Sequence, residues 1–558
     1  MTYAMVATIA ALGSQEHSMA DLRTSGAPTE VDALIVGAGF AGMYMLHRMR
    51  ELGFSAHVVE AGSDVGGTWY WNRYPGARCD IESLAYQYSF SDEIQREWNW
   101  SERYAAQPEL LEYARWVADK FDLRSGMQFN TRVTTAHYQD TDGRWLIETD
   151  QGDRFSARFC IMATGCLSVP RMPDFPGLED FEGHRYHTGE WPHEGVDFTG
   201  KRVGVIGTGS SGIQSIPLIA EQAASLTVFQ RTPNFAIPAH NRPLTQKQRD
   251  RNKEVFQDLR REAENFVPAR SGGPAAVPRT LEVPEAEREQ RFEDHWNMGG
   301  LMFMAAFGDL LVKQEANDTA ADFVRRKIHE IVKDQEVAAL LAAQDFPLGT
   351  KRLCVDTGYY DTFNRETVSL VNLRTEPIET ITPGGLCTSD REFEFDALVF
   401  ATGFDAMTGA LLAVDIRGRE GVSLRDEWEH GPRTYLGLQV AGFPNLFTIT
   451  GPGSPSVLSN MLISIEQHVE WISNCMEYMR ERDLTTIEAT PEAQDAWVDH
   501  VRELGEKTLY PQANSWYIGA NIPGKPRVFM PYVAGVGPYR KRCDAVAAAG
   551  YEGFALSS

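Results

Sequence analysis

Two glycine-rich units, far apart in the chain, most constrain what this sequence can fold into. The first spans residues 31–60 and the second spans residues 201–231. Each has a short apolar run typical of a buried parallel strand, then the pattern GxGxxG, then apolar residues at helical spacing. The glycines permit a tight turn, and the first amides of the helix can bind a diphosphate. The two units therefore predict two dinucleotide-binding lobes.

The first unit favours an adenine dinucleotide that lacks a 2′-phosphate. Its glycines are Gly37, Gly39 and Gly42, and its second strand ends in Glu60. A carboxylate at this place accepts hydrogen bonds from a ribose 2′-hydroxyl and repels a 2′-phosphate. The segment that follows, residues 65–80, combines a Gly-Gly turn with several aromatic residues, and we expect it to line the flat ring of a flavin.

The second unit differs from the first where the acid should stand. After the glycines Gly207, Gly209 and Gly212, its second strand ends in Gln-Arg-Thr, which places Arg231 and Thr232 beside the ribose. A guanidinium can bind phosphate oxygens in a bidentate manner. This difference between the two units assigns FAD to the first unit and NADPH to the second.

The chain order of these units predicts an α/β fold with two Rossmann-like dinucleotide-binding domains, one for FAD and one for NADP, and a helical insertion. Residues 163–165 and 401–403 both read Ala-Thr-Gly after an apolar strand, which is typical of crossings between lobes. The expected partition is a flexible N-terminal extension (1–27), an FAD domain in two parts (28–165 and 396–558), an NADP domain in two parts (166–238 and 348–395) and a helical insertion (239–347).

Composition excludes several other classes. The 558 residues carry 53 basic and 77 acidic side chains, for a net charge of −24, which disfavours a nucleic-acid partner. No apolar run is long enough to cross a bilayer, so no membrane partner is expected. The seven cysteines include no C-x-x-C pair, which favours free thiols in the cytoplasm over a disulfide framework or a metal site. Nothing indicates an obligate interface, so a monomer is expected.

Residues 181–192 carry the most specific motif of the chain. They read Phe-Glu-Gly-His-Arg-Tyr-His-Thr-Gly-Glu-Trp-Pro, and a GxGxxG unit lies on either side of them. The segment matches F-x-G-x-x-x-H-x-x-x-W-P, and the chain resembles the type I Baeyer–Villiger monooxygenases over nearly its whole length. The stretches 451–461 and 514–527 look like the branch that contains phenylacetone monooxygenase and steroid monooxygenase.

The resemblance implies an NADPH- and dioxygen-dependent oxidation of ketones to esters or lactones. In that family, reduced FAD forms a flavin peroxide that attacks the ketone, and negative charge then develops in a tetrahedral adduct. Such a reaction needs a fixed cation near the developing charge and exclusion of water. The branch suggests aryl-aliphatic, long-chain, bulky cyclic or steroid ketones as substrates, in a pocket lined by residues 454–461. Sulfoxidation is expected as a side activity.

The resemblance also assigns roles to residues. Arg352 would stabilise the peroxide and the adduct, and Asp80 would hold Arg352. His187 and Trp191 of the motif would couple cofactor binding to movement between the lobes. The implied FAD contacts are Gly37, Ala38, Gly39, Phe40, Gly42, Glu60, Thr68, Trp69, Trp71, Asp80, Tyr86, Val133 and Met461. The implied NADP contacts are Arg78, Thr208, Gly209, Ser210, Ser211, Gly212, Gln214, Arg231, Thr232, Lys351, Arg352 and Trp516; Lys525 is a further candidate cation.

Three other classes of protein share part of this pattern. An N- or S-oxygenating flavin monooxygenase shares the fold but needs no cation to stabilise an oxyanion. A non-enzymatic dinucleotide sensor would bind the cofactors without using ketones. A pyridine nucleotide–disulfide reductase has two similar lobes, but it needs a cysteine pair beside the flavin, and this sequence shows none.

Overall fold

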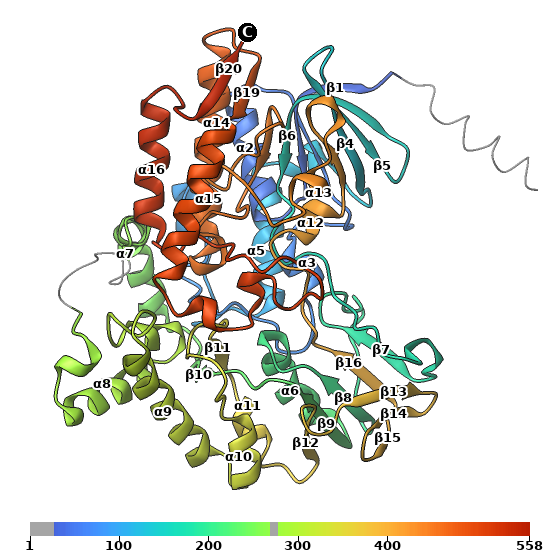
Figure 1. Ribbon diagram of the computed structural model, residues 1–558, viewed down its shortest axis with the longest axis vertical. Helices are drawn as coiled ribbons and strands as arrows, with labels where there is room; N and C mark the ends of the chain where they lie inside the picture. Colours follow the sequence, from blue (N-terminus) through green and yellow to red (C-terminus); the bar gives the residue numbers. More distant parts are fainter. Residues whose placement is uncertain (1–26, 268–276) are drawn as a thin grey trace, which may run out of the picture.

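The structure, a computed structural model, describes residues 27–267 and 277–558. Two sheets form the centres of two lobes, one in the upper half and one in the lower half of Figure 1. The expected N-terminal extension lies almost entirely outside the described residues. No helix in the described part of the chain is both long and apolar enough to cross a membrane.

The first sheet is built from two distant parts of the chain. Its order is β17-β4-β5-β6-β1-β2-β3, and β18 also pairs with β6. The central strands β1, β2 and β6 are parallel and buried, as their continuous apolar runs predict. The strands are β1 (Thr29–Val36), β2 (Ala56–Val59), β3 (Met127–Gln128), β4 (Val133–Gln139), β5 (Arg144–Thr149), β6 (Arg154–Met162), β17 (Asp415–Arg417) and β18 (Leu446–Thr448).

The second sheet is wholly parallel, in the order β12-β9-β8-β16-β7. Its strands are β7 (His184–His187), β8 (Arg202–Ile206), β9 (Ser225–Gln230), β12 (Val368–Asn372) and β16 (Ala397–Phe400). The position of β16 corrects the expected boundary at residue 396, because this strand pairs with β7 and β8 rather than with the first sheet. The chain therefore leaves the second lobe after Phe400.

A helical segment between β10 (Ala236–Pro238) and β11 (Cys354–Asp356) occupies the lower left of Figure 1. These two strands pair in parallel, which brings the ends of the segment together. Its helices are α7 (Gln246–Glu264), α8 (Glu285–Met298), α9 (Gln314–Ile331) and α10 (Gln335–Leu341). The expected fold class, two dinucleotide-binding lobes with a helical insertion, is confirmed.

The remaining elements cover the two sheets. Helices of the first lobe are α2 (Phe40–Glu51), α3 (Thr68–Trp71), α4 (Asp92–Glu97), α5 (Gln107–Lys120), α12 (Gly409–Leu412), α13 (Leu424–Glu427), α14 (Met461–Arg480), α15 (Pro491–Glu506) and α16 (Val536–Ala548). The second lobe adds α6 (Ser210–Gln222), α11 (Tyr359–Thr362) and a small antiparallel sheet of β13 (Ile378–Thr382), β14 (Gly385–Thr388) and β15 (Glu392–Glu394). Strands β19 (Thr486–Ala489) and β20 (Phe554–Ser557) pair near the C-terminus.

Candidate active site

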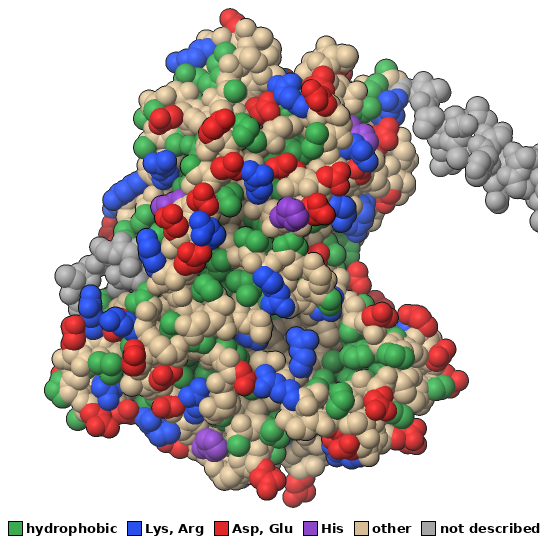
Figure 2. All heavy atoms as spheres, in the orientation of Figure 1, with side chains coloured by type: hydrophobic (Ala, Val, Ile, Leu, Met, Phe, Trp, Pro, Cys, Tyr) green, Lys and Arg blue, Asp and Glu red, His purple; other side chains and the backbone are tan. Residues whose placement is uncertain are grey.

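A cavity of about 770 Å³ lies between the lobes and is lined by both glycine loops. Its walls come from the loops after β1 and β8, the segment 68–86, the loop before α14 and residues 514–521. Figure 2 shows Lys and Arg side chains gathered around a hollow in the middle of one face, between the two halves. The carboxyl ends of the parallel strands of both sheets meet there, which is where this fold class binds its ligands.

On the first-lobe side, the start of α2 is open toward the cavity. Gly39 precedes the helix without a side-chain cap, and no acidic residue stands in its first turn. Gly37 has a φ of +105°, which favours glycine. A Cβ on Gly42 would lie 1.8 Å from the carbonyl oxygen of Gly37, so the helix packs directly on the turn. The free amides fit a diphosphate.

Glu60 does more than the sequence predicts. Its carboxylate lines the cavity, and it also accepts hydrogen bonds from the amides of Ala38 and Gly62, both at 2.7 Å. Burial raises the pKa of Glu60, although these hydrogen bonds oppose the shift. Each carboxylate oxygen keeps a further lone pair, so Glu60 can hold the glycine loop and a ribose hydroxyl at once.

On the second-lobe side, α6 begins in the same open way after Gly209. Arg231 and Thr232 follow β9 at the cavity wall, and Lys351 lines the same wall from the end of the insertion. Burial lowers the pKa of Lys351 to about 8, and the charges of Arg231 and Arg374 add to this effect. The gathering of cations at the end of β9 fits a phosphate on the ribose.

Arg352 and Asp80 form a bidentate ion pair inside the cavity. Arg352 Nε donates to Asp80 Oδ2 at 2.8 Å, and Nη2 donates to Oδ1 at 2.7 Å. Nη1 donates to the carbonyl oxygen of Val457 at 2.8 Å, in the loop before α14. Burial opposes the charge of Arg352, but Asp80 and the neighbouring Tyr517 outweigh it, so its pKa is raised. A permanent positive charge thus stands in a fixed orientation.

The two lobes touch beside this ion pair. Tyr74 Oη donates to Gln214 Oε1 at 2.8 Å, and Gln214 Nε2 donates to the carbonyl oxygen of Arg78 at 3.1 Å. Arg78 itself pairs with Glu102 at 3.1 Å. Gln214 lies on α6, so the helix that carries the second glycine motif contacts the segment that lines the first.

The motif histidine sits at a crossing between elements rather than in the cavity. His187 ends β7 and is 4% exposed. Its Nδ1 accepts a hydrogen bond from the Gly189 amide at 3.0 Å, and its Nε2 lies 3.2 Å from Thr402 Oγ1. Burial lowers the pKa of His187 to about 4, so the ring is neutral near pH 7. Trp191 packs into the second-lobe core beside Tyr186 and Phe198.

Most of the residues that the sequence assigns to the site line this one cavity. Those assigned to the site that lie behind its surface are Ala38, Gly42, Gly212, His187 and Trp191. Ala38 contributes its amide to Glu60, whereas the two glycines allow each helix to approach its turn. Lys525 does not line the cavity, because its ammonium group pairs with Asp405 at 2.5 Å.

Sequence reasoning missed several residues that line the cavity or contact Arg352. Arg171 and Asn521 line the cavity, and Val457 and Tyr517 contact or adjoin Arg352. Arg171 follows the first Ala-Thr-Gly segment, but no motif includes it. Val457 acts through its backbone carbonyl, which no side-chain pattern reveals.

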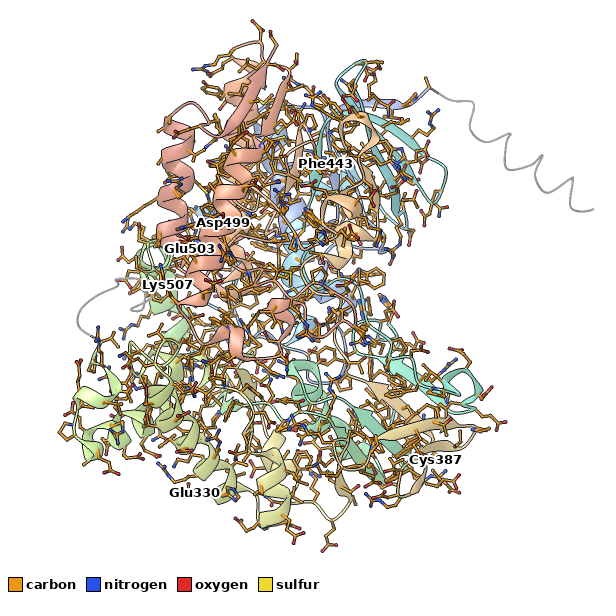
Figure 3. All side chains as sticks on the ribbon, viewed as in Figure 1. Glu330, Cys387, Phe443, Asp499, Glu503 and Lys507 are labelled. Atoms are coloured by element: carbon orange, nitrogen blue, oxygen red, sulfur yellow. The ribbon has the colours of Figure 1, made fainter. Side chains whose placement is uncertain are left out.

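All seven cysteines lie in the described part of the chain and are free. Cys79 and Cys166 line the cavity, but burial raises the pKa of both thiols, that of Cys166 to about 11. Cys387 lies in β14, far from the cavity on the outer side of the second lobe (Figure 3). The raised pKa values disfavour the thiolate form that a dithiol redox centre uses.

Comparisons with known proteins agree with this geometry. A family described as pyridine nucleotide-disulphide oxidoreductase matches residues 34–263. A Baeyer–Villiger monooxygenase of Pseudooceanicola batsensis is 44% identical over 95% of this chain and 96% of its own. A solved oxidised steroid monooxygenase bound to NADP is 50% identical, with a TM-score of 0.90 over 95% of this chain and all of its own. A solved complex of OTEMO with FAD and NADP is 41% identical, with a TM-score of 0.90 over 95% of this chain and all of its own.

These relatives span nearly the whole chain at high identity, and two of them carry nucleotides in their solved structures. The two open helix starts, the acid after β2 and the cations after β9 fit the same pair of nucleotides. The expected enzyme class and the expected cofactors, FAD and NADP, are confirmed. The chain belongs to the flavin-dependent Baeyer–Villiger monooxygenases.

Proposed function

We propose that Arg352 is the residue that stabilises negative charge on the ketone oxygen while one oxygen atom of dioxygen is inserted beside the carbonyl. The observation that carries this proposal is the bidentate hold of Asp80 on Arg352, with the third arm fixed by the Val457 carbonyl. A charge oriented before reaction costs no reorganisation when the oxyanion forms. The raised pKa of Arg352 keeps it charged across the working pH range.

FAD, once bound and reduced by NADPH, supplies the activation of dioxygen. The chain's own residues bind the two nucleotides, orient the ketone and keep water out. We infer that the first lobe holds FAD through the start of α2 and Glu60. The second lobe holds NADPH through the start of α6 together with Arg231, Thr232 and Lys351. Tyr74 and Gln214 keep the two lobes in register across the cavity.

His187 fits a positioning role in this proposal. The ring accepts from the Gly189 amide and can donate from Nε2 to Thr402, whose hydroxyl donates to the Arg171 carbonyl at 2.5 Å. This chain of hydrogen bonds joins the motif segment to both loops that cross between the lobes. His187 therefore holds the two crossing loops in place relative to each other, and it does not act as a base in the cavity.

The expected ketones are apolar. Val457 contacts Arg352, and Met461, Tyr86 and Trp69 line the same cavity. This lining suits aryl-aliphatic, long-chain or bulky cyclic ketones better than charged ones. A panel of phenylacetone, cyclohexanone, a long 2-ketone and a steroid ketone ranks these classes by kcat/KM.

The test of Arg352 is its replacement by Ala in the FAD-loaded enzyme. We expect flavin reduction by NADPH to remain, and ester formation to fall by about a hundredfold or more, as for loss of an oxyanion-stabilising donor. The matched control is Arg391→Ala, because Arg391 makes a bidentate pair with Glu376 at 2.9 and 2.6 Å but lies away from the cavity. Ester and consumed NADPH are measured together.

The outcomes separate the candidate activities. Loss of ester formation with continued NADPH oxidation, and no change in Arg391→Ala, supports the role of Arg352. Ester formation at the wild-type rate in Arg352→Ala would overturn it. If the wild-type enzyme oxygenates amines or sulfides but none of the ketones, its activity is N- or S-oxygenation and not ketone oxidation.

A further inference from the structure

Five of the Lys and Arg residues that line the cavity divide into two kinds. Arg78 and Arg352 each have a carboxylate partner, Glu102 and Asp80 respectively. Arg171, Arg231 and Lys351 line the same cavity, and none of the three has a carboxylate within 4 Å among the described residues. Cavity cations without a carboxylate partner are free to bind an anion.

These three cations influence one another. Burial lowers the pKa of Arg171, and the charge of Arg231 lowers it further. Lys351 responds in the same way, first to burial and then to Arg231. Arg171 and Lys351 are thus both affected by the charge of Arg231, and all three line the same cavity. Like charges in this arrangement repel one another, and an anion placed among them removes the repulsion.

Arg171 is held firmly in this position by its surroundings. Its amide donates to the carbonyl oxygen of Gly403 at 2.9 Å, and its own carbonyl oxygen accepts from Thr402 Oγ1. One guanidinium nitrogen, Nη1, donates to the carbonyl oxygen of Asn521. Nε and Nη2 have no partner among the described residues, and they leave most of the guanidinium donors available.

Unpaired polar groups near Arg171 also point to a ligand. Ser515 is 2% exposed and lines the cavity, and its hydroxyl has no hydrogen-bond partner in the described structure. Asn521 lines the cavity as well, and its Oδ1 is likewise buried without a partner, although its Nδ2 donates to the Phe404 carbonyl at 2.7 Å. Because Oδ1 only accepts hydrogen bonds, it fits a hydroxyl of the nucleotide rather than the phosphate. Buried polar groups of this kind cost free energy unless something satisfies them.

We propose that Arg171 is a third cation for the 2′-phosphate of NADPH, beside Arg231 and Lys351, and that it makes the enzyme select NADPH over NADH. The proposal rests on the placement of NADPH proposed above. Arg231 stands at the end of β9, where a fold of this class places the ribose of its adenosine. Arg171 pairs through its backbone with Thr402 and Gly403, just after β16, and β16 pairs with β8, the strand that leads into the second glycine loop. Arg171 and Arg231 therefore line the cavity from the same lobe.

An anionic ketone is the other possible ligand for this guanidinium. Arg352, where the ketone would react, is held by Asp80 and by the Val457 carbonyl oxygen. Arg171 is instead held by Gly403, on the second-lobe loop after β16. The observations therefore favour the phosphate of the cofactor, and a carboxylate-bearing ketone becomes an arm of the test.

The experiment measures flavin reduction by NADPH and by NADH, without ketone, in FAD-loaded wild type and Arg171→Gln. We expect the ratio of efficiencies, NADPH over NADH, to fall about tenfold or more, the loss typical of one hydrogen bond to a charged group. Efficiency with NADH should stay within about twofold, because NADH lacks the phosphate. Arg365→Gln serves as the control, since Arg365 lies on the same lobe but outside the cavity and keeps only a 3.9 Å contact with Glu221.

Arg231→Gln distinguishes failure of this inference from failure of the NADPH placement. If Arg231→Gln lowers the ratio and Arg171→Gln does not, the role of Arg171 is wrong and the placement stands. If neither changes the ratio, the placement itself is wrong. An equal loss with NADPH and NADH in Arg171→Gln overturns the 2′-phosphate assignment. A second assay measures the turnover of a carboxylate-bearing ketone and of its methyl ester by wild type and Arg171→Gln. A loss confined to the carboxylate-bearing ketone overturns the assignment in favour of the substrate.

Discussion

At the scale of the residue, the site depends on side chains whose partners come from distant parts of the chain. Asp80 and Arg352 are 272 residues apart, yet they form the bidentate pair at the centre of the cavity. Burial alone would disfavour the charge on the guanidinium, and the carboxylate reverses that effect. A buried ion pair stabilises a fold only modestly, so its orientation matters more here than its strength.

Lys351 should make the binding of NADP⁺ depend on pH, which Arg231 cannot do because a guanidinium stays charged. Because burial lowers the pKa of Lys351 to about 8, the side chain is charged below that pH and neutral above it. A 2′-phosphate binds the charged form, so the Kd for NADP⁺ should rise, by about tenfold, as the pH is raised from about 7 to 9. The Kd for NAD⁺ should stay flat. Titration of flavin absorbance with each nucleotide measures both.

The control for this dependence is Lys351→Arg, whose guanidinium stays charged throughout this range. In that variant the Kd for NADP⁺ should no longer change between pH 7 and 9. An unchanged pH dependence in Lys351→Arg would show that another group titrates.

The roles of side chains that belong to a motif could be predicted from the sequence. The roles that depend on contacts with distant parts of the chain could not. The distance of Glu60 from the first glycine loop predicts its role, and the residue lines the cavity. Its hydrogen bonds to two backbone amides depend on the path of the loop, which no residue pattern records. The proposed role of Arg171 depends on the charge of Arg231 and on a hydrogen bond to Asn521, and both residues are remote in sequence.

At the scale of the element, the glycine loops work because each helix begins in contact with its own turn. Gly42 faces the Gly37 carbonyl in α2, and Gly212 faces the Gly207 carbonyl in α6, where a Cβ would stand 2.4 Å from that oxygen. This packing directs the first amides of both helices toward the cavity. The repetition in both lobes explains why the GxGxxG units could be read from the sequence.

Gly42→Ala should therefore release FAD. The added methyl group would meet the Gly37 carbonyl oxygen at 1.8 Å, so α2 must shift and its amides must leave the diphosphate. We expect purified Gly42→Ala to contain less than about half of the wild-type flavin and to unfold at a lower Tm. Gly384→Ala is the control, because no atom lies within 4 Å of its added methyl group. Wild-type flavin content in Gly42→Ala would contradict this account of the turn.

Strand order is the part of the element scale that the sequence predicted less well. The run Ala397–Phe400 is apolar and buried on both faces, and such a run fits either sheet equally. Only its pairing with β7 and β8 shows that it belongs to the second lobe. The ring of Trp191 lies in the second-lobe core, and its role in gating stays a prediction.

At the scale of the whole molecule, the cavity exists because two lobes and an insertion are joined at several points. The first lobe reaches α6 through Tyr74 and Gln214. The insertion is tied to the first lobe by a buried ion pair between Arg260 of α7 and Glu466 of α14. These contacts bring both glycine loops to one continuous cavity, as transfer of a hydride between two cofactors requires.

In the proposed reaction, one oxygen atom of dioxygen enters the ketone beside its carbonyl. The balance is ketone, dioxygen, NADPH and a proton giving ester, water and NADP⁺. The most direct test is mass spectrometry of the ester formed under ¹⁸O₂ by the FAD-loaded enzyme. The account predicts one ¹⁸O atom per ester, in the bridging oxygen, with one NADPH consumed. An unlabelled ester, or label only in hydrogen peroxide with the ketone unchanged, would contradict it.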